Sequence, residues 1–383
     1  MSHWSSYTEQ LREAGERVLA QLPSKDPQLV AETEQMLFAT LSRIFVAVSA
    51  SDPAHPAFVP ELSLAFNLLA PNADTIYMTS YIEDSGVYRL RGTRGQIPIF
   101  NMTQISGIGP IKGDYDFDDI KLDADGRFEL IVSAERPSDH AGNWWQLQSG
   151  TKGLMVRRMG YNWGQEIEPE LTIDRLDVFP ARPRPTAEEL HAKFSTFAKL
   201  TEAFTLAFLN HVDGLENEGF VNKLKFIDYG EAVGLTGQFY YEGVFDIAED
   251  EALILEVVPP KDARYWSVIL ADDIFATVDW INRQSSLNGA QAVADADGVY
   301  RLVVSRREPG VPNWLDATGY KHGAIQGRFT RFPAPSPTLP TLTKVKLADV
   351  RSHLPAATPQ ISREQRELSL RARREGWQRR RIW

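Results

Sequence analysis

The chain has 383 residues, of which 43% are hydrophobic, and a formal net charge of −10. This length exceeds that of one ordinary domain, so two or three domains with cores of their own are expected. The absence of cysteine excludes disulfides, thiolate metal sites, iron–sulfur clusters and cysteine nucleophiles. An acidic body also argues against general nucleic-acid binding, which rests on basic surfaces.

The charge is unevenly distributed along the chain. Residues 361–383 carry eight arginines and three glutamates, a net of +5, which leaves −15 for the remainder. A basic run of this kind packs on the protein's own acidic surface or on a neighbouring subunit more often than it binds nucleic acid or an anionic membrane. A homo-oligomer held by this tail is therefore an open alternative.

The N-terminal region is not typical of a secretory signal, because no basic end is followed by an apolar run. The most apolar early stretch, residues 37–50, contains Arg43 and is too short to cross a bilayer. We therefore expect a cytoplasmic protein without a membrane span.

Helices are expected at the start of the chain. Residues 5–22 carry apolar side chains at helical spacing. A second helix is predicted to begin at Asp26-Pro27, because aspartate caps free N–H groups and proline suits the first turn. Three prolines between residues 53 and 60 end this helical region.

Strands are expected from about residue 62 to residue 175. The stretches 75–81, 87–91, 97–102 and 128–132 are rich in β-branched and aromatic residues or alternate between apolar and polar ones. Glycine turns separate them at short intervals, which favours an antiparallel sandwich or barrel.

A linker is predicted at the proline-rich residues 180–185. Thr186 and Glu189 fit a capping box, so a helix should follow, and helical structure is expected to continue to about Asp228. Its apolar stripe is interpreted as core packing between domains rather than as a cofactor pocket. The stripe comprises Leu190, Phe194, Phe197, Phe204 and Phe208.

Two long stretches repeat each other. Residues 123–159 and 295–332 both begin with Asp-Ala-Asp-Gly, continue as an apolar strand and reach Asn-Trp after a charged loop. The two Asn-Trp pairs, at Asn143 and Asn313, are 170 positions apart (313 − 143). Strand patterns at 238–245, 252–258 and 265–270 likewise match those at 76–81, 87–90 and 97–102. We interpret the chain as an internal duplication.

The predicted fold is mainly β with helical additions: two duplicated antiparallel β-sandwich or jelly-roll-like domains joined by a helical linker, with N- and C-terminal helices. The expected divisions are N-terminal helices at 1–60, a first β-sandwich domain at 61–180, a helical linker at 181–230, a second β-sandwich domain at 231–350 and a basic C-terminal helix at 351–383.

Polar and aromatic side chains are densest between Asn313 and Gly323. Asp316 and His322 are candidates for an acid/base pair in which the carboxylate orients the imidazole. The alternative is that the amide and carboxylate make local turn hydrogen bonds while Trp314 fills a core. The first copy has Gln146 in place of Asp316 and no match for His322, so the second copy is the candidate for activity.

Further candidates for substrate binding lie elsewhere in the chain. Arg283 or Arg328 could hold a carboxylate or phosphate, and Asn288 could donate a hydrogen bond; for the loop that carries Arg283 and Asn288, an internally satisfied turn is the alternative. Tyr265, Trp266 and Trp314 are expected to pack against the substrate, alongside the amide of Asn313. In the first half, Asn72 and Tyr77 belong to a comparable polar and aromatic set.

No cofactor is predicted, because the chain has no dinucleotide fingerprint, Walker loop or nucleophile elbow. The seven histidines are scattered without the spacing of paired metal ligands. A divalent cation held by aspartates stays open.

Several of these residues carry a resemblance to known families. Tyr265-Trp266-Ser267, residues 285–288 and the Pro-Asn-Trp-Leu-Asp block that ends at Asp316 resemble the bacterial domain-of-unknown-function family numbered twelve-fourteen. Residues 71–77 resemble its usual partner, the family numbered twelve-fifty-four. The resemblance covers roughly residues 62–350 and implies two jelly-roll-like β-sandwiches joined by helices, with no settled activity. The family pattern has histidine directly after the glycine; this chain has Tyr320 there, which makes Tyr320 an alternative proton donor to His322.

Three functions remain open at this point. The first is a soluble enzyme that acts on a small, partly apolar metabolite by acid/base chemistry as a lyase, hydrolase or isomerase, with its pocket in or beside the second sandwich or between the two. The second is a non-catalytic jelly-roll module for a carbohydrate or lipid. The third is a structural or assembly protein. A pocket with a titratable group of perturbed pKa favours the first, and a shallow aromatic platform favours the second.

Overall fold

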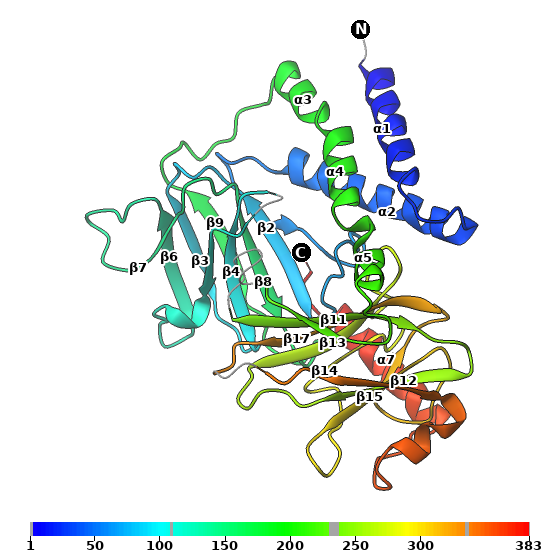
Figure 1. The fold of residues 1–383 in the computed structure, drawn as a ribbon. Helices are drawn as coiled ribbons and strands as arrows, with labels where there is room; N and C mark the ends of the chain where they lie inside the picture. Colours follow the sequence, from blue (N-terminus) through cyan, green and yellow to red (C-terminus); the bar gives the residue numbers. More distant parts are fainter. Residues whose placement is uncertain (1–2, 108–109, 230–236, 334–336, 383) are drawn as a thin grey trace.

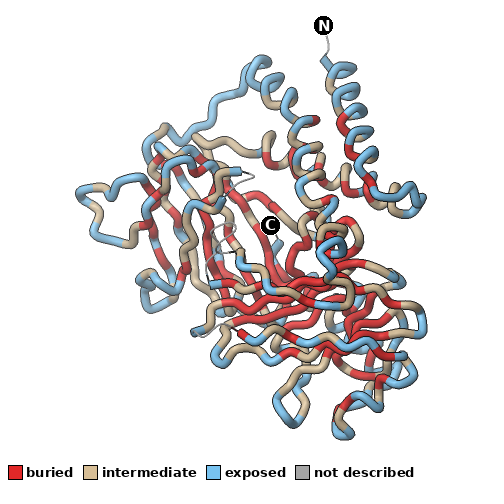
Figure 2. Tube along the Cα trace, viewed as in Figure 1, coloured by how far each residue is buried: buried red, intermediate tan, exposed pale blue. Residues whose placement is uncertain are grey.

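In the computed structural model, the described residues are 3–107, 110–229, 237–333 and 337–382. Two β-sandwiches lie against each other, and helices from the N-terminus and from the middle of the chain form a separate layer beside them (Figure 1). Buried residues concentrate in the strands, whereas the helices are mostly exposed (Figure 2). The predicted boundary between residues 230 and 231 lies outside the described residues.

The first sandwich pairs a five-stranded sheet with a four-stranded sheet. The five-stranded sheet has the order β1-β2-β8-β4-β5, with β1 at Val59–Pro60, β2 at Thr75–Tyr81, β8 at Gly153–Met159, β4 at Ile99–Ile105 and β5 at Gly113–Asp116. The four-stranded sheet has the order β7-β6-β3-β9, with β7 at Asn143–Gln146, β6 at Arg127–Ser133, β3 at Tyr88–Thr93 and β9 at Glu170–Arg175. Buried apolar side chains such as Phe100 and Leu130 fill the space between these two sheets.

The second sandwich repeats this arrangement. Its five-stranded sheet has the order β10-β11-β17-β13-β14, with β10 at Lys225–Ile227, β11 at Gln238–Asp246, β17 at His322–Thr330, β13 at Tyr265–Ala271 and β14 at Ser286–Asn288. Its four-stranded sheet has the order β16-β15-β12-β18, with β16 at Trp314–Asp316, β15 at Tyr300–Ser305, β12 at Glu251–Val257 and β18 at Thr341–Lys346. The core between them includes Phe245, Val268 and Phe329.

The two strand orders are the same when each strand of the first half is matched to the strand nine positions later. Strand pairs are antiparallel in both halves except β6–β7 and β15–β16, which are parallel and occupy equivalent places. The prediction of two duplicated β-sandwiches with N- and C-terminal helices is therefore confirmed. The pairing of sheet faces follows from the alternation of side chains along each strand.

The helical layer contains α1 at Trp4–Leu19, α2 at Pro27–Phe45, which continues into a π-helical turn at Val46–Ala50, α3 at Ala187–Phe194, α4 at Phe197–Leu209 and α5 at His211–Asn217. Asp26 caps α2 as predicted, since its side chain accepts hydrogen bonds from the N–H groups of Gln28 and Leu29. The predicted capping box of Thr186 and Glu189 is also present. No helix in the described part of the chain is long and apolar enough to cross a membrane.

Two expectations about the middle of the chain are wrong. Helix α5 ends at Asn217, and the residues just before Asp228 form β10, which pairs with β11 as β1 pairs with β2. None of the five residues of the predicted apolar stripe is buried. Helix α4 instead buries Ala198, Thr201, Thr205 and Leu209, because small side chains allow close helix contacts: Thr205 reaches Thr40 of α2 at 3.2 Å.

The arginine-rich C-terminal segment forms α7 at Arg363–Gln378, after two short 3-10 turns at Phe117–Asp119 and Leu347–His353 earlier in the chain. Three arginines spaced seven residues apart insert into the body of the protein. Arg366 bonds to Glu308 and Gln284, and Arg373 bonds to the carbonyl of Trp280, all in the second half. Arg380 instead reaches the first half. The tail thus packs on the protein itself and fastens the two halves together.

Arg380 provides a test of this fastening. Its side chain is fully buried, pairs with Glu168 at 2.6 Å and donates to the carbonyl of Asp74 at 2.7 Å. We expect Arg380→Ala to lower the free energy of unfolding by roughly 3–5 kcal/mol, because Glu168 loses its buried partner. Arg379→Ala is the matched control, since Arg379 is largely exposed, and should change stability by less than about 0.5 kcal/mol. Urea denaturation measures both, and equal effects would contradict the fastening role.

Candidate functional site

Asn313 has a structural role that Asn143 repeats. The amide of Asn313 donates to the carbonyls of Val293 and Arg301 and accepts from the N–H of Val293. The amide of Asn143 makes the same three kinds of bond, with Lys121 and Glu129. Each asparagine therefore ties together two segments: the loop that precedes the neighbouring strand (β15 or β6) and that strand itself. The polar residues around the two Asn-Trp pairs are therefore explained by a structural role that both halves share.

Trp314 is also engaged internally. Its indole N–H donates to the carbonyl of Ser305 at 3.1 Å, and its ring lies beneath the guanidinium of Arg366. The indole of Trp144 in the first half donates to the hydroxyl of Ser133, the counterpart of Ser305. Trp266 points into the core of the second sandwich rather than towards a shared site.

The expected pair of Asp316 and His322 does not form. Asp316 accepts from the N–H of Thr318 at 2.7 Å and contacts the guanidinium of Arg283 at 3.3 Å. His322 instead bonds through Nδ1 to Asp273 at 2.6 Å. Tyr320, the alternative proton donor, bonds to Glu32 of α2 at 3.0 Å. The three candidate catalytic side chains thus bond to different residues and do not meet.

His322 lies in an acidic pocket of about 390 Å³ between α5 and the start of β17. The hydrogen bond that His322 donates to Asp273 is the main reason why the pKa of His322 is raised. Burial raises the pKa of the neighbouring Asp272 to about 7. Within the described residues, no three histidine, aspartate or glutamate side chains converge in a way that could hold a metal ion.

Five other predicted residues do come together, at the contact between the two sandwiches. These are Asn72, Tyr77, Tyr265, Asn288 and Arg328. The outer face of the sheet with β2, β8 and β4 meets the outer face of the sheet with β11, β17 and β13 (Figure 1). We call the facing side chains of these six strands, with the flanking residues that bond to them, the inter-sheet layer.

Strand register builds the layer in rows. On the first sheet, Tyr77, Arg157 and Asn101 occupy one cross-strand row. On the second sheet, Tyr240, Arg328 and Ser267 do so. Because side chains alternate along a strand, these residues share a face while their neighbours fill the two sandwich cores. Tyr77 lies beside Arg328, which brings the two rows against each other.

One end of the layer is organised around Asp74. Its fully buried carboxylate accepts hydrogen bonds from the phenol of Tyr265 at 2.5 Å, from Asn288 at 2.8 Å and from the indole of Trp163 at 2.8 Å. Asn72 bonds to the same phenol at 2.8 Å. Burial raises the pKa of Asp74, and these donors oppose the rise. This end is satisfied internally and joins the halves.

The other end contains two arginines, Arg328 and Arg157. Arg328 is buried, stacks on the ring of Tyr240 and bonds to its phenol at 3.3 Å and to Gln326. Arg157 bonds to Thr103 at 2.9 Å. Among the described residues, no carboxylate forms an ion pair with the buried guanidinium of Arg328, although buried charges are normally paired. Arg157 is partly exposed, and its charge acts on the carboxylate of Asp114.

Buried polar atoms without hydrogen-bond partners occur along the facing strands, at both ends of the layer. They are Thr75 Oγ1, Thr79 Oγ1, Asn101 Oδ1, Arg328 Nε and Thr330 Oγ1. All five belong to the facing strands of the layer. Buried polar groups in folded proteins almost always have a hydrogen-bond partner, so these atoms point to a polar occupant of the layer.

An acid/base pair that sequence reasoning missed borders this region. His211 of α5 bonds through Nε2 to Glu242 of β11 at 2.8 Å, and Tyr229 and Gln326 donate to the same carboxylate. Glu242 is completely buried, whereas His211 is partly exposed. The only signal in the sequence was a glutamate among the apolar and aromatic residues of the strand at 238–245.

Burial also fixes the ionisation of the phenols. It raises the pKa of Tyr240, and the guanidinium of Arg328 offsets only part of this. Burial likewise raises the pKa of Tyr229, with Glu242 adding to the effect. These phenols therefore stay protonated near neutral pH, and each O–H donates within the protein, from Tyr240 to Gln238 and from Tyr229 to Glu242.

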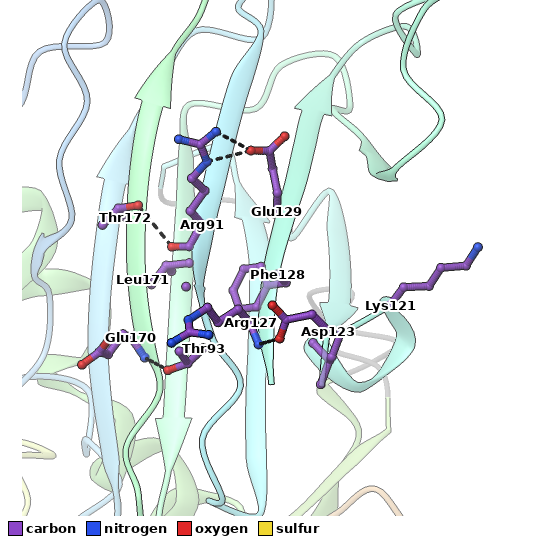
Figure 3. A pocket seen from close by; sticks show the side chains of 12 residues that line it. Arg91, Thr93, Lys121, Asp123, Arg127, Phe128, Glu129, Glu170, Leu171 and Thr172 are labelled. Carbon is purple, nitrogen blue, oxygen red and sulfur yellow. Dashed lines mark hydrogen bonds and ion pairs between the residues drawn. The ribbon is translucent and has the colours of Figure 1, made fainter. Parts of the chain in front are cut away.

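A charged groove on the outer face of the first sandwich is a weaker candidate. It measures about 690 Å³ and lies over β3, β6 and β9. Figure 3 shows that Arg91 points to Glu129 rather than to an open space, and their ion pair measures 2.6 Å. Arg127 pairs with Asp125. Since these charges neutralise each other and Phe128 is buried, the groove offers no aromatic platform.

The fold and site define a protein of two related β-sandwiches in one chain, with a polar contact between them. A family model described as protein of unknown function (DUF1214) matches residues 249–329, in the second half. This supports the resemblance to the family numbered twelve-fourteen there. No curated protein matches the chain.

The similar solved structures include the following two. An uncharacterized protein from Burkholderia cenocepacia shares 27% identity with a TM-score of 0.81, over 90% of this chain and 97% of its own. A protein from Vibrio parahaemolyticus shares 14% identity with a TM-score of 0.49, over 83% of this chain and 99% of its own. The Burkholderia structure supports the fold over nearly the whole chain.

The structural roles of Asn313 and Asn143 can be compared directly. We expect Asn313→Ala and Asn143→Ala each to lower the free energy of unfolding by about 1–3 kcal/mol, because backbone groups lose their partners. Neither variant should change ligand binding, since both asparagines lie outside the inter-sheet layer. Thermal unfolding with and without ligand measures both quantities. A selective loss of binding in Asn313→Ala would restore the loop as a binding site.

Asp272 predicts a pH dependence of stability. The unfolded chain releases this proton near the ordinary value of 3.8, but the folded protein keeps it up to about pH 7. Folding stability is therefore lost as pH rises between these values. Asp272→Asn keeps the oxygen that accepts from Ile274 and Ala276 but cannot ionise. Relative to wild type, this variant should gain on the order of 2–4 kcal/mol between pH 4 and pH 7. Urea titrations at both pH values measure the gain, and a constant difference would contradict it.

Proposed function

We propose that this protein is an enzyme that binds a small, partly apolar anionic metabolite in the inter-sheet layer and moves protons on it. The main support for this proposal is the buried Arg328. It has no carboxylate partner, and several polar atoms on the facing strands lack hydrogen bonds. A guanidinium in such a place binds a carboxylate with charge-assisted hydrogen bonds. The site proposed here replaces the loop from Asn313 to His322.

The surrounding side chains support the same substrate class. Arg157 lies on the opposing row and supplies a second positive charge. Met155 neighbours it along β8, and Met159 and Ile99 pack with Tyr265, which provides apolar contacts beside the charged ones. A small metabolite with one anionic end and an apolar body fits both features.

The proposed chemistry is acid/base, in the lyase, hydrolase or isomerase classes. Tyr77 is a phenol beside Arg328 and can donate a hydrogen bond to an oxygen that gains charge during reaction, whereas the O–H of Tyr240 donates to Gln238. Glu242 orients the imidazole of His211, which takes or returns a proton. Tyr265 and Asp74 position the two sheets and do not take part in the transfer.

Two further elements belong to this proposal. The first half, residues 61–180, is assigned to the partner family numbered twelve-fifty-four on the resemblance of residues 71–77. The protein is placed in the cytoplasm, where small anionic metabolites are available to it.

A matched pair of arginine variants tests the binding site. Small aromatic and branched aliphatic carboxylates are screened by thermal shift against their neutral amides, and the hits are measured by calorimetry. Arg328→Gln should weaken carboxylate binding by at least about tenfold, because a buried charge-assisted pair is lost. Arg328→Lys should retain part of the affinity. Arg283→Gln is the control, since Arg283 is half exposed and pairs with Asp316. A loss in Arg283→Gln alone would move the anion site to the loop.

Proton transfer is tested separately from binding. A carboxylate that binds is incubated in D₂O, and the exchange of its carbon-bound protons is followed by NMR. We expect exchange with the wild type and a rate lower by about 10²-fold or more in His211→Asn, with affinity retained. Binding without exchange in the wild type would favour the non-catalytic binding module over the enzyme.

A further inference from the structure

The helical layer contains an apolar pocket that the proposed function does not use. It measures about 710 Å³ and lies between the first half of α1, the end of α2, and the junction of α3 and α4. We call it the helix pocket. Its apolar lining includes Leu11, Leu41, Phe45, Phe66, Phe194 and Phe197. Phe194 and Phe197 are two of the five residues of the predicted apolar stripe, none of which is buried.

Few polar groups of the helix pocket are free to contact a ligand. Thr8 donates its hydroxyl to carbonyls of its own helix, and Ser42 donates to the carbonyl of Phe38. The amide of Gln10 bonds to Ser6. These three side chains therefore donate hydrogen bonds within α1 and α2, and the lining of the pocket is mainly apolar.

The remaining polar groups meet in one corner. The phenol of Tyr7 bonds to Nδ1 of His191 at 2.7 Å, and the ring of His3 lies 4.2 Å from the ring of His191. These groups come from two segments far apart in the sequence, at the start of α1 and within α3. None of the residues that the structure places around the pocket is an aspartate, glutamate, lysine or arginine.

We infer that the helix pocket binds a single-chain amphipathic carboxylate of the fatty-acid type. The apolar chain lies among the phenylalanines, and the carboxylate accepts hydrogen bonds from Tyr7 and the imidazoles. An apolar pocket with a few convergent polar groups is the usual form of a small-molecule site, and its volume is within the range of such sites. Phenol and imidazole N–H groups are donors, which suits an acceptor oxygen on the ligand.

A small ligand fits the helix pocket better than a protein partner. A stable protein interface covers about 800 Å² on each partner, over a broad surface rather than a concavity of this size. Helix α3, which forms one wall, buries none of its residues in the protein. An apolar chain in the pocket would cover exposed aromatic surface on both α2 and α3.

Two phenylalanines of α2 give a matched test. Phe45 lines the helix pocket and is 53% exposed, whereas Phe38 is 71% exposed and lies outside it. Binding of sodium dodecanoate, below its micelle-forming concentration, is measured by calorimetry. Phe45→Asp should weaken binding by about tenfold or more, because a charge replaces an apolar contact. Phe38→Asp should leave it unchanged. Ser42→Trp, which fills the pocket, should also abolish binding.

The carboxylate end is tested with a second ligand and a second variant. Dodecanoate should bind more tightly than 1-dodecanol, and Tyr7→Phe should weaken dodecanoate binding by about fivefold, the loss expected for one hydrogen bond. Equal affinities for the acid and the alcohol would overturn the assignment of the head group. The absence of dodecanoate binding by the wild type would overturn the site itself.

A vesicle experiment separates the pocket from a membrane surface. Co-sedimentation with phosphatidylcholine vesicles, with and without anionic lipid, should show no binding by the wild type. If the protein sediments with vesicles and both phenylalanine variants lose this equally, the exposed rings bind a bilayer and the pocket inference is wrong. Neither result depends on Arg328, so this inference stands or falls separately from the proposed function.

Discussion

The arrangement of the two sandwiches depends on one buried carboxylate. Asp74 belongs to the first half, yet two of the three donors to its side chain, Tyr265 and Asn288, belong to the second. Its backbone carbonyl also accepts from Arg380 of the C-terminal segment. Taking a carboxylate out of water is costly unless donors are fixed around it, so the carboxylate favours only the docked state of the two halves. Docking in turn sets one outer sheet face against the other and creates the inter-sheet layer.

Duplication explains why the candidate site lies between the copies rather than within one. Both halves retain the structural hydrogen bonds of the repeat. These are the bonds of Asn143 and Asn313 to backbone groups and the bonds of the two indoles to Ser133 and Ser305. The outer sheet faces differ, since one presents Tyr77 and Arg157 and the other presents Tyr240 and Arg328. The two sandwiches thus present two different sheet faces, and a ligand that contacts both faces can bind only when the two sandwiches are docked.

The sequence predicted the fold better than the site. Alternation, caps and the repeat are local patterns, and the corresponding strands, helix starts and duplication are present. Of the predicted binding residues, Tyr77 and Arg328 lie beside each other in the inter-sheet layer, whereas the densest cluster, around Asn313, is occupied with backbone bonds. Density of polar residues was misleading because structural loops and binding loops use the same residue types. His211 and Glu242 were missed because nothing local relates a helix to a strand that begins 27 positions later (238 − 211).

By itself, the amino-acid sequence determined that this chain forms two related β-sandwiches with capped helices around them, because each of these features follows from neighbouring residues or from the comparison of the two copies. Only the tertiary structure decided which polar side chains meet. In a sheet buried on both faces, the sequence tells which residues share a face but not what that face contacts. The docking of the two sheets left Arg328 without a counter-charge, and the packing of the helices left Phe194 and Phe197 beside a pocket, since both outcomes depend on contacts between distant segments.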